Sequence, residues 1–197
     1  MRVRIKLSVL VVLIIFIGCS KDQETQVQTV TQIDTVYVTK NDTIRLTEYI
    51  NDSTTTVILT RHAETTGIGA DPSLSVSGQE RSTELARVLH TTTIRAAYAT
   101  NYKRTQETAA SVAGKNGLSV RIYDPSKLNA LADSLLLNYR NQVVYVAGHS
   151  NTTNVLLNIL LGSSVYGDIP ENEYDNLYIA NVSAKGNARV IHFKYGD

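Results

Sequence analysis

Short apolar segments alternate with helical segments between residues 57 and 161, and this order limits the possible folds more than any other feature. Apolar, partly β-branched runs predict strands over 57–60, 96–99, 118–123 and 143–147. Periodic apolar positions predict helices over 77–90, 103–113, 126–139 and 151–161. Strands that alternate with helices favour a mostly parallel sheet covered on both faces. We therefore predict an α/β protein, a three-layer α/β/α sandwich.

Capping and turn residues predict where some of these elements begin and end. Ser77, with Glu80 at capping-box spacing, is predicted to cap the first helix. Gly114 is predicted to stop the second helix. A turn around Lys185-Gly186-Asn187 predicts that the segments 177–182 and 189–193 form a hairpin.

Residues 1–18 have the features of an export signal. A basic start is followed by the apolar run 7–17, which is shorter than the roughly 20 residues that span a bilayer. The run ends in Ile17-Gly18-Cys19-Ser20, which resembles a bacterial lipobox. Cys19 is the one cysteine of the chain, so an internal disulfide is excluded. We predict lipidation at Cys19 and attachment to a bacterial membrane, facing the periplasm or the outer surface. A plain signal peptide or an N-terminal anchor is the alternative.

Residues 19–55 are rich in Thr, Gln, Asp and Asn and have few apolar positions. We predict a polar tether. The partial alternation over 29–38 allows a second interpretation, an added edge strand. The domain itself is then predicted over 56–197. A net charge of +1 gives no indication of a nucleic-acid-binding surface.

Three predicted strand ends carry residues that bind and transfer anions. Arg61 and His62 follow the first strand, Arg104 enters the helix after the second, and His149 follows the fourth. Ligand sites of such sheets form outside the carboxyl ends of the strands. Arg guanidinium groups match phosphate oxygens, and a neutral imidazole can attack phosphorus. Nearby arginines are expected to lower the pKa of both histidines and keep the nucleophile neutral.

Four sequence blocks in order resemble the histidine phosphatase superfamily, also called phosphoglycerate-mutase-like. The blocks are Arg61-His62-Ala63-Glu64-Thr65, Leu74-Ser75-Val76-Ser77-Gly78, Thr100-Asn101-Tyr102-Lys103-Arg104-Thr105-Gln106-Glu107-Thr108-Ala109, and the strand that ends in Gly148-His149. The resemblance implies that His62 is the phosphorylated nucleophile and that Arg61, Arg104 and His149 hold the phosphoryl group. Asn151 adds a contact to the substrate in this scheme. The resemblance implies no metal and no cofactor.

The proton donor is the part of the pattern that this sequence does not supply at the family's positions. Ala130 stands where many members have Glu, and Ser150 stands where another branch has Asp. The remaining candidates are Glu64, Asp71, Asp124 and the cluster Glu171, Glu173 and Asp175. For the cluster, a solvated loop is the simpler interpretation.

The segment between Arg104 and His149 leaves no room for a helical lid, so we predict a shallow, open site. The predicted activity is hydrolysis of phosphomonoesters or phosphoprotein groups through phospho-His62. The substrate would be a small molecule or a protein. The alternatives are a catalytically degenerate phosphate-binding lipoprotein and, more distantly, a phosphoglycerate mutase, which must shield its intermediate from water.

Overall fold

The computed structural model describes residues 54–196. Its elements in chain order are β1 (Thr55–Arg61), α1 (Val76–Val88), β2 (Ile94–Thr100), α2 (Lys103–Lys115), β3 (Val120–Tyr123), α3 (Leu128–Asn138), β4 (Val143–Gly148), α4 (Thr153–Leu161), β5 (Asn176–Ala184) and β6 (Asn187–Lys194). The strands and helices predicted from the sequence are confirmed, with shifted ends.

Within these residues six strands form one sheet in the order β3-β2-β4-β1-β5-β6. The strands β3, β2, β4 and β1 are parallel, and β5 and β6 add to the β1 side as an antiparallel hairpin. The mostly parallel sheet and the hairpin are as predicted. The order places β4 between β1 and β2, so the three strand ends that carry the candidate residues are neighbours.

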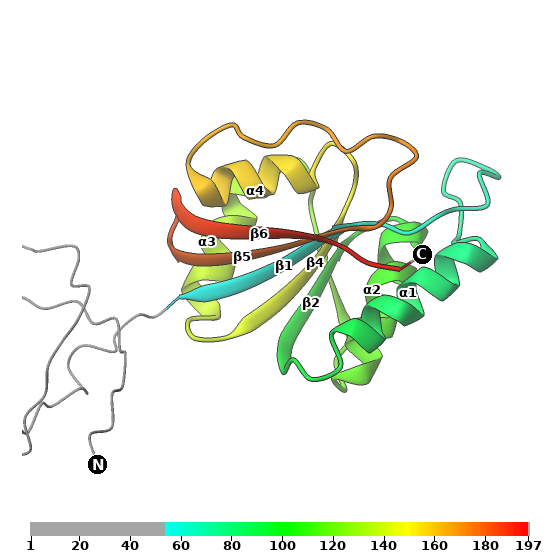
Figure 1. Ribbon diagram of the computed structural model, residues 1–197, viewed down its shortest axis with the longest axis horizontal. Coiled ribbons are helices and arrows are strands. Elements are labelled where there is room, and N and C mark those ends of the chain that lie inside the picture. Colours follow the sequence, from blue (N-terminus) through cyan, green and yellow to red (C-terminus); the bar gives the residue numbers. More distant parts are fainter. Residues whose placement is uncertain (1–53, 197) are drawn as a thin grey trace, which may run out of the picture. The chain divides into compact units, whose positions relative to one another are not determined.

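Helices cover both faces of the sheet (Figure 1), with α1 and α2 on one side and α3 and α4 on the other. Successive residues of β1 face alternately the α3–α4 layer and the α1–α2 layer. Val57 and Leu59 pack with α3 and α4, whereas Ile58 packs with α1 and α2. All three side chains are buried, as expected for a strand covered on both faces. The predicted three-layer sandwich is confirmed.

Two predicted helix ends are wrong. The cap of α1 is Ser75, whose hydroxyl accepts a hydrogen bond from the Gly78 amide at 3.1 Å, and not Ser77. The Ser75 amide donates to the carbonyl of Glu64 at 2.9 Å, and this contact fixes the start of the helix. Gly114 lies inside α2, and Gly117, with a φ of 65°, reverses the chain after the helix.

The predicted signal segment, the lipidated Cys19 and the tether or edge strand lie almost entirely outside the described residues. Among the helices of residues 54–196, none has the length and apolarity needed to cross a bilayer.

Candidate active site

The ends of β1, β4 and β2 bring together four predicted residues, Arg61, His62, Arg104 and His149, which we call the histidine–arginine cluster. Arg61 is the last residue of β1 and is paired in register with Gly148, the last residue of β4. His62 and His149 each come next along the chain. Their ring centroids are 5.5 Å apart in an edge-to-face arrangement.

The backbone at the end of β4 is fixed closely enough to exclude a side chain at Gly148. The His62 amide donates to the carbonyl of Gly148 at 2.9 Å. A Cβ at residue 148 would lie 2.7 Å from the hydroxyl of Thr153 and 3.1 Å from that of Thr152. The same turn is closed by the His149 amide, which donates to Thr152 Oγ1 at 2.9 Å. This packing holds the two histidines at a fixed separation.

The hydrogen bond of His62 identifies the nitrogen that can react. Its Nδ1 lies 2.8 Å from the carbonyl oxygen of Ala63, which can only accept, so Nδ1 carries the proton. In the neutral ring the lone pair is then on Nε2. The Ala63 amide donates to Thr108 Oγ1 at 2.9 Å, which anchors the backbone that holds this ring.

His149 has the opposite proton arrangement. Its Nδ1 lies 3.4 Å from Nη2 of Arg104, which can only donate, so Nδ1 is the acceptor. Nε2 then donates to Thr100 Oγ1 at 2.8 Å. Thr105 Oγ1 lies 2.7 Å from the same hydroxyl and orients it. His149 therefore lies against Arg104 through one nitrogen and against β2 through the other.

Both histidines are held neutral, but the cause differs in part from the sequence-based expectation. Burial is the largest effect on His62 and lowers its pKa to about 4, opposed by the hydrogen bond to Ala63 and assisted by the charges of Arg61 and Arg104. Burial also leads for His149, whose pKa falls to about 4, followed by Arg104 and Arg61. The predicted direction is confirmed, while the arginines are secondary to loss of hydration.

Arg61 is buried and only partly neutralised by the protein. Its Nη1 donates to the carbonyls of Pro170 and Glu173, and its Nη2 donates to the carboxylate of Glu171 at 2.7 Å. Nε is buried and has no hydrogen-bond partner within residues 54–196. A buried charged donor without a partner is costly, so the Arg61 charge is only partly balanced by its protein contacts.

Two tyrosines belong to the site and were missed by the sequence analysis. The guanidinium of Arg61 lies 4.4 Å from the centre of the Tyr174 ring, and that of Arg104 lies 4.6 Å from the Tyr102 ring. Tyr102 also meets His149 edge-to-face at 5.2 Å. Tyr102 directly precedes α2, so its place beside Arg104 was available as a signal. Tyr174 comes from a distant loop and left no such signal.

The candidate proton donors differ in the hydrogen-bond partners of their carboxylates. Glu64 follows the histidine in sequence, yet both of its carboxylate oxygens accept hydrogen bonds from Arg81 Nε, at 2.8 and 2.9 Å. Asn151, which was predicted to contact the substrate and not to donate a proton, is exposed in the turn before α4. Of the acidic cluster, Glu171 contacts the Arg61 side chain, whereas the Glu173 and Asp175 carboxylates pair with Lys194.

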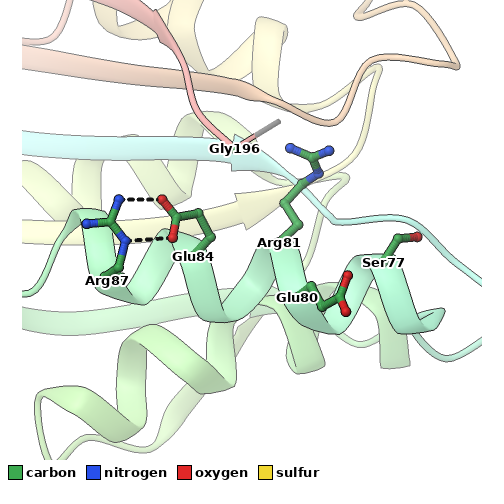
Figure 2. A pocket seen from close by; sticks show the side chains of 6 residues that line it. All are labelled: Ser77, Glu80, Arg81, Glu84, Arg87 and Gly196. Carbon is green, nitrogen blue, oxygen red and sulfur yellow. Dashed lines mark hydrogen bonds and ion pairs between the residues drawn. The ribbon is translucent and has the colours of Figure 1, made fainter.

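A surface hollow of about 590 Å³ lies along α1 and beside Gly196 (Figure 2). It is lined by Ser77, Glu80, Arg81, Glu84, Arg87 and Gly196. Arg87 and Glu84, three residues apart on α1, form an ion pair along one wall of the hollow, and the lining includes neither histidine. In the part of the chain that the structure describes, no three His, Cys, Asp or Glu side chains gather as a metal site would require.

Residues 57–125 match the family model of the histidine phosphatase superfamily (branch 1). The matched segment contains Arg61, His62 and Arg104, whereas His149 lies beyond it. The assignment of His149 to the site therefore depends on the geometry above. No curated protein matches the chain.

Solved structures share the fold at low sequence identity. A mycobacterial glucosyl-3-phosphoglycerate phosphatase is 12% identical, with a TM-score of 0.60 over 72% of this chain and 99% of its own. The protein histidine phosphatase SixA, complexed with tungstate, is 16% identical, with a TM-score of 0.60 over 71% and 96%. YhfR of Bacillus stearothermophilus is 16% identical, with a TM-score of 0.59 over 69% and 95%. At these identities the likeness shows the fold.

Proposed function

We propose that this chain is a branch 1 member of the histidine phosphatase superfamily and that it hydrolyses phosphomonoesters through a covalent phosphohistidine on His62. One observation carries the proposal: a neutral, buried imidazole with its lone pair on Nε2 lies within the electrostatic influence of Arg61 and Arg104. Phosphoryl transfer requires mainly positioning and charge stabilisation, and this arrangement supplies both.

Each member of the histidine–arginine cluster has a role in the proposed reaction. Nε2 of His62 attacks the phosphorus atom while Nδ1 remains bound to Ala63. Arg61 and Arg104 bind the phosphoryl oxygens, since guanidinium groups carry the matching donors. His149 takes up a proton on Nδ1 when the dianion binds and then donates to a phosphoryl oxygen. In this scheme the arginines stabilise the charge, so a chelator is not expected to reduce activity.

The substrate class follows from the absence of an insertion between Arg104 and His149. The segment contains only the rest of α2, then β3, α3 and β4. An open site favours a phosphate on a protein or an exposed small ester over an enclosed metabolite. We further propose that the chain is lipidated at Cys19 and acts in the bacterial envelope.

The test is hydrolysis of 4-nitrophenyl phosphate by the purified chain and by His62→Ala. Because His62 forms the intermediate, His62→Ala is expected to lose at least about 10³-fold in kcat/KM and all acid-labile ³²P labelling. Near-normal activity of His62→Ala would refute the nucleophile assignment. Phosphate binding without hydrolysis by the unsubstituted chain would favour the alternative, a degenerate phosphate-binding lipoprotein. Phosphoryl transfer between positions of a phosphoglycerate, without net hydrolysis, would favour a mutase.

A further inference from the structure

The acidic side chain in closest contact with the site is Glu171, in the loop between α4 and β5. Its Oε2 accepts a hydrogen bond from Arg61 Nη2 at 2.7 Å. Its Oε1 accepts one from the hydroxyl of Ser150, which directly follows His149, at 3.2 Å. The carboxylate therefore links the end of β1 to the end of β4, the two strand ends that carry the histidines.

Burial differs sharply across this ion pair. The Arg61 side chain is 4% exposed, whereas that of Glu171 is 84% exposed. Arg61 is held in place by Pro170, Glu173 and Tyr174 from the same loop. Glu171 therefore lies on the solvent side of the arginine, and its carboxylate can exchange protons with water.

The other acidic candidates have partners that compete with a role at the histidines. Glu64 is bound through both oxygens to Arg81, and Asp124 accepts from the amide and hydroxyl of Ser126. Asp71 accepts from the Lys103 amide at 3.0 Å and lies 3.8 Å from Arg104. Asp71 is thus the strongest competitor of Glu171.

We propose, on the basis of the proposed phosphatase function, that Glu171 donates the proton to the leaving oxygen. The electron pair of His62 Nε2 forms the N–P bond as the P–O bond to the leaving group breaks. The leaving oxygen keeps the electron pair of the broken P–O bond and takes the proton of Glu171. In the second step a water oxygen attacks phosphorus, its proton returns to the Glu171 carboxylate, and the N–P pair returns to Nε2.

Substrate binding would supply the protonated form that this role requires. In the unliganded site the pKa of Glu171 is below its usual value, chiefly through the charge of Arg61 and then through the Ser150 hydrogen bond. The groups that face Glu171 are Arg61 at the end of β1, His62 directly after it, and Ser150 after β4. A phosphate dianion bound to Arg61 offsets the positive charge and adds a negative one, so both effects raise the proton affinity of Glu171.

The experiment compares two esters hydrolysed by the full chain, purified in detergent. An alkyl phosphate has a poor leaving group and needs the donor, whereas 4-nitrophenyl phosphate needs it less. Glu171→Gln is expected to lower kcat/KM on the alkyl phosphate by roughly 10²-fold or more, and on the nitrophenyl ester by less than about tenfold. The fall of alkyl phosphate hydrolysis at high pH, which reports the donor, is also expected to disappear.

Two further variants, Glu173→Gln and Asp71→Asn, and the unsubstituted chain serve as controls for the Glu171 assignment. Glu173→Gln, from the same loop, is expected to keep the ratio between the two esters. An equal loss on both esters, a gain on both, or a leaving-group dependence in Asp71→Asn instead would overturn the Glu171 assignment while His62-dependent hydrolysis persists. If the parent hydrolyses neither ester, the proposed function fails, and the donor role fails with it.

Discussion

At the scale of single residues, the site combines two imidazoles that are kept neutral with the guanidinium groups of two arginines. The hydrogen bonds settle the proton positions, because the Ala63 carbonyl can only accept and Arg104 can only donate. His62 thus presents Nε2 and His149 presents Nδ1. The two rings are poised differently, one to attack and the other to bind, although both have a pKa of about 4.

The lowered pKa values of the histidines predict how stability depends on pH. In the unfolded chain each imidazole binds a proton near the ordinary value of 6.5, and in the folded chain only near 4. Between these values the unfolded state binds more protons, so the free energy of unfolding falls as pH falls from 6.5 to 4. For the buried His62 the loss is at most about 3 kcal/mol.

Urea unfolding between pH 7 and pH 4 measures this effect. The double variant His62→Asn and His149→Asn is expected to lose less stability over this range than the parent chain, because Asn does not titrate. Equal loss in both proteins would mean that the two imidazoles are not held neutral by the fold.

The residues of the site could be predicted from sequence to the extent that they stand at strand ends. Arg61, His62 and His149 each follow a recognisable apolar strand, and parallel strands bring their carboxyl ends to one edge. The partners of Arg61 could not be predicted in this way. Glu171 is 110 residues away along the chain, and its loop has no periodic pattern that would place it. Likewise, burial of the histidines depends on packing, which explains why the sequence led us to the arginines and not to burial as the cause of the lowered pKa values.

At the scale of elements, the contact between Glu64 and α1 determines where that helix starts. The Glu64 carbonyl accepts from the Ser75 amide, and the helix then passes Glu64 at Gly78. This contact explains why a local capping pattern at Ser77 gave the wrong start. The order of the strands in the sheet could not be predicted from the sequence pattern either, because strand pairing depends on contacts between distant segments.

Gly78→Ala is predicted to destabilise the fold. A Cβ at this residue would lie 2.1 Å from the Glu64 carbonyl oxygen, which is backbone and cannot rotate away. The expected loss is about 2 kcal/mol or more, typical of overpacking that forces a backbone shift, measured by urea unfolding. Gly114→Ala is the matched control, since its Cβ meets no atom within 4 Å. It is expected to stabilise the chain by up to about 1 kcal/mol through helix propensity. The same sign for both variants would contradict this account of α1.

At the scale of the whole molecule, residues 54–196 supply the hydrogen-bond partners described above for the histidine–arginine cluster. The cluster is held by β1, β2, β4, α2 and the loop before β5. The solved structures that share the fold are covered almost over their full length. The proposed lipid at Cys19 would therefore determine where the protein acts, and its chemistry would depend on residues 54–196.

Cys19→Ala tests this separation of location from chemistry. Several acyl chains on one residue anchor a protein stably, so the parent is expected in the membrane fraction with incorporated radiolabelled palmitate. Cys19→Ala is expected to lose the label and leave that fraction, while kcat/KM for 4-nitrophenyl phosphate in detergent stays within about twofold, because the groups proposed for phosphoryl transfer belong to Arg61, His62, Arg104 and His149. Retained palmitate labelling of the variant would place the modification elsewhere. Membrane retention without any label in either protein would favour the alternative of an uncleaved N-terminal anchor.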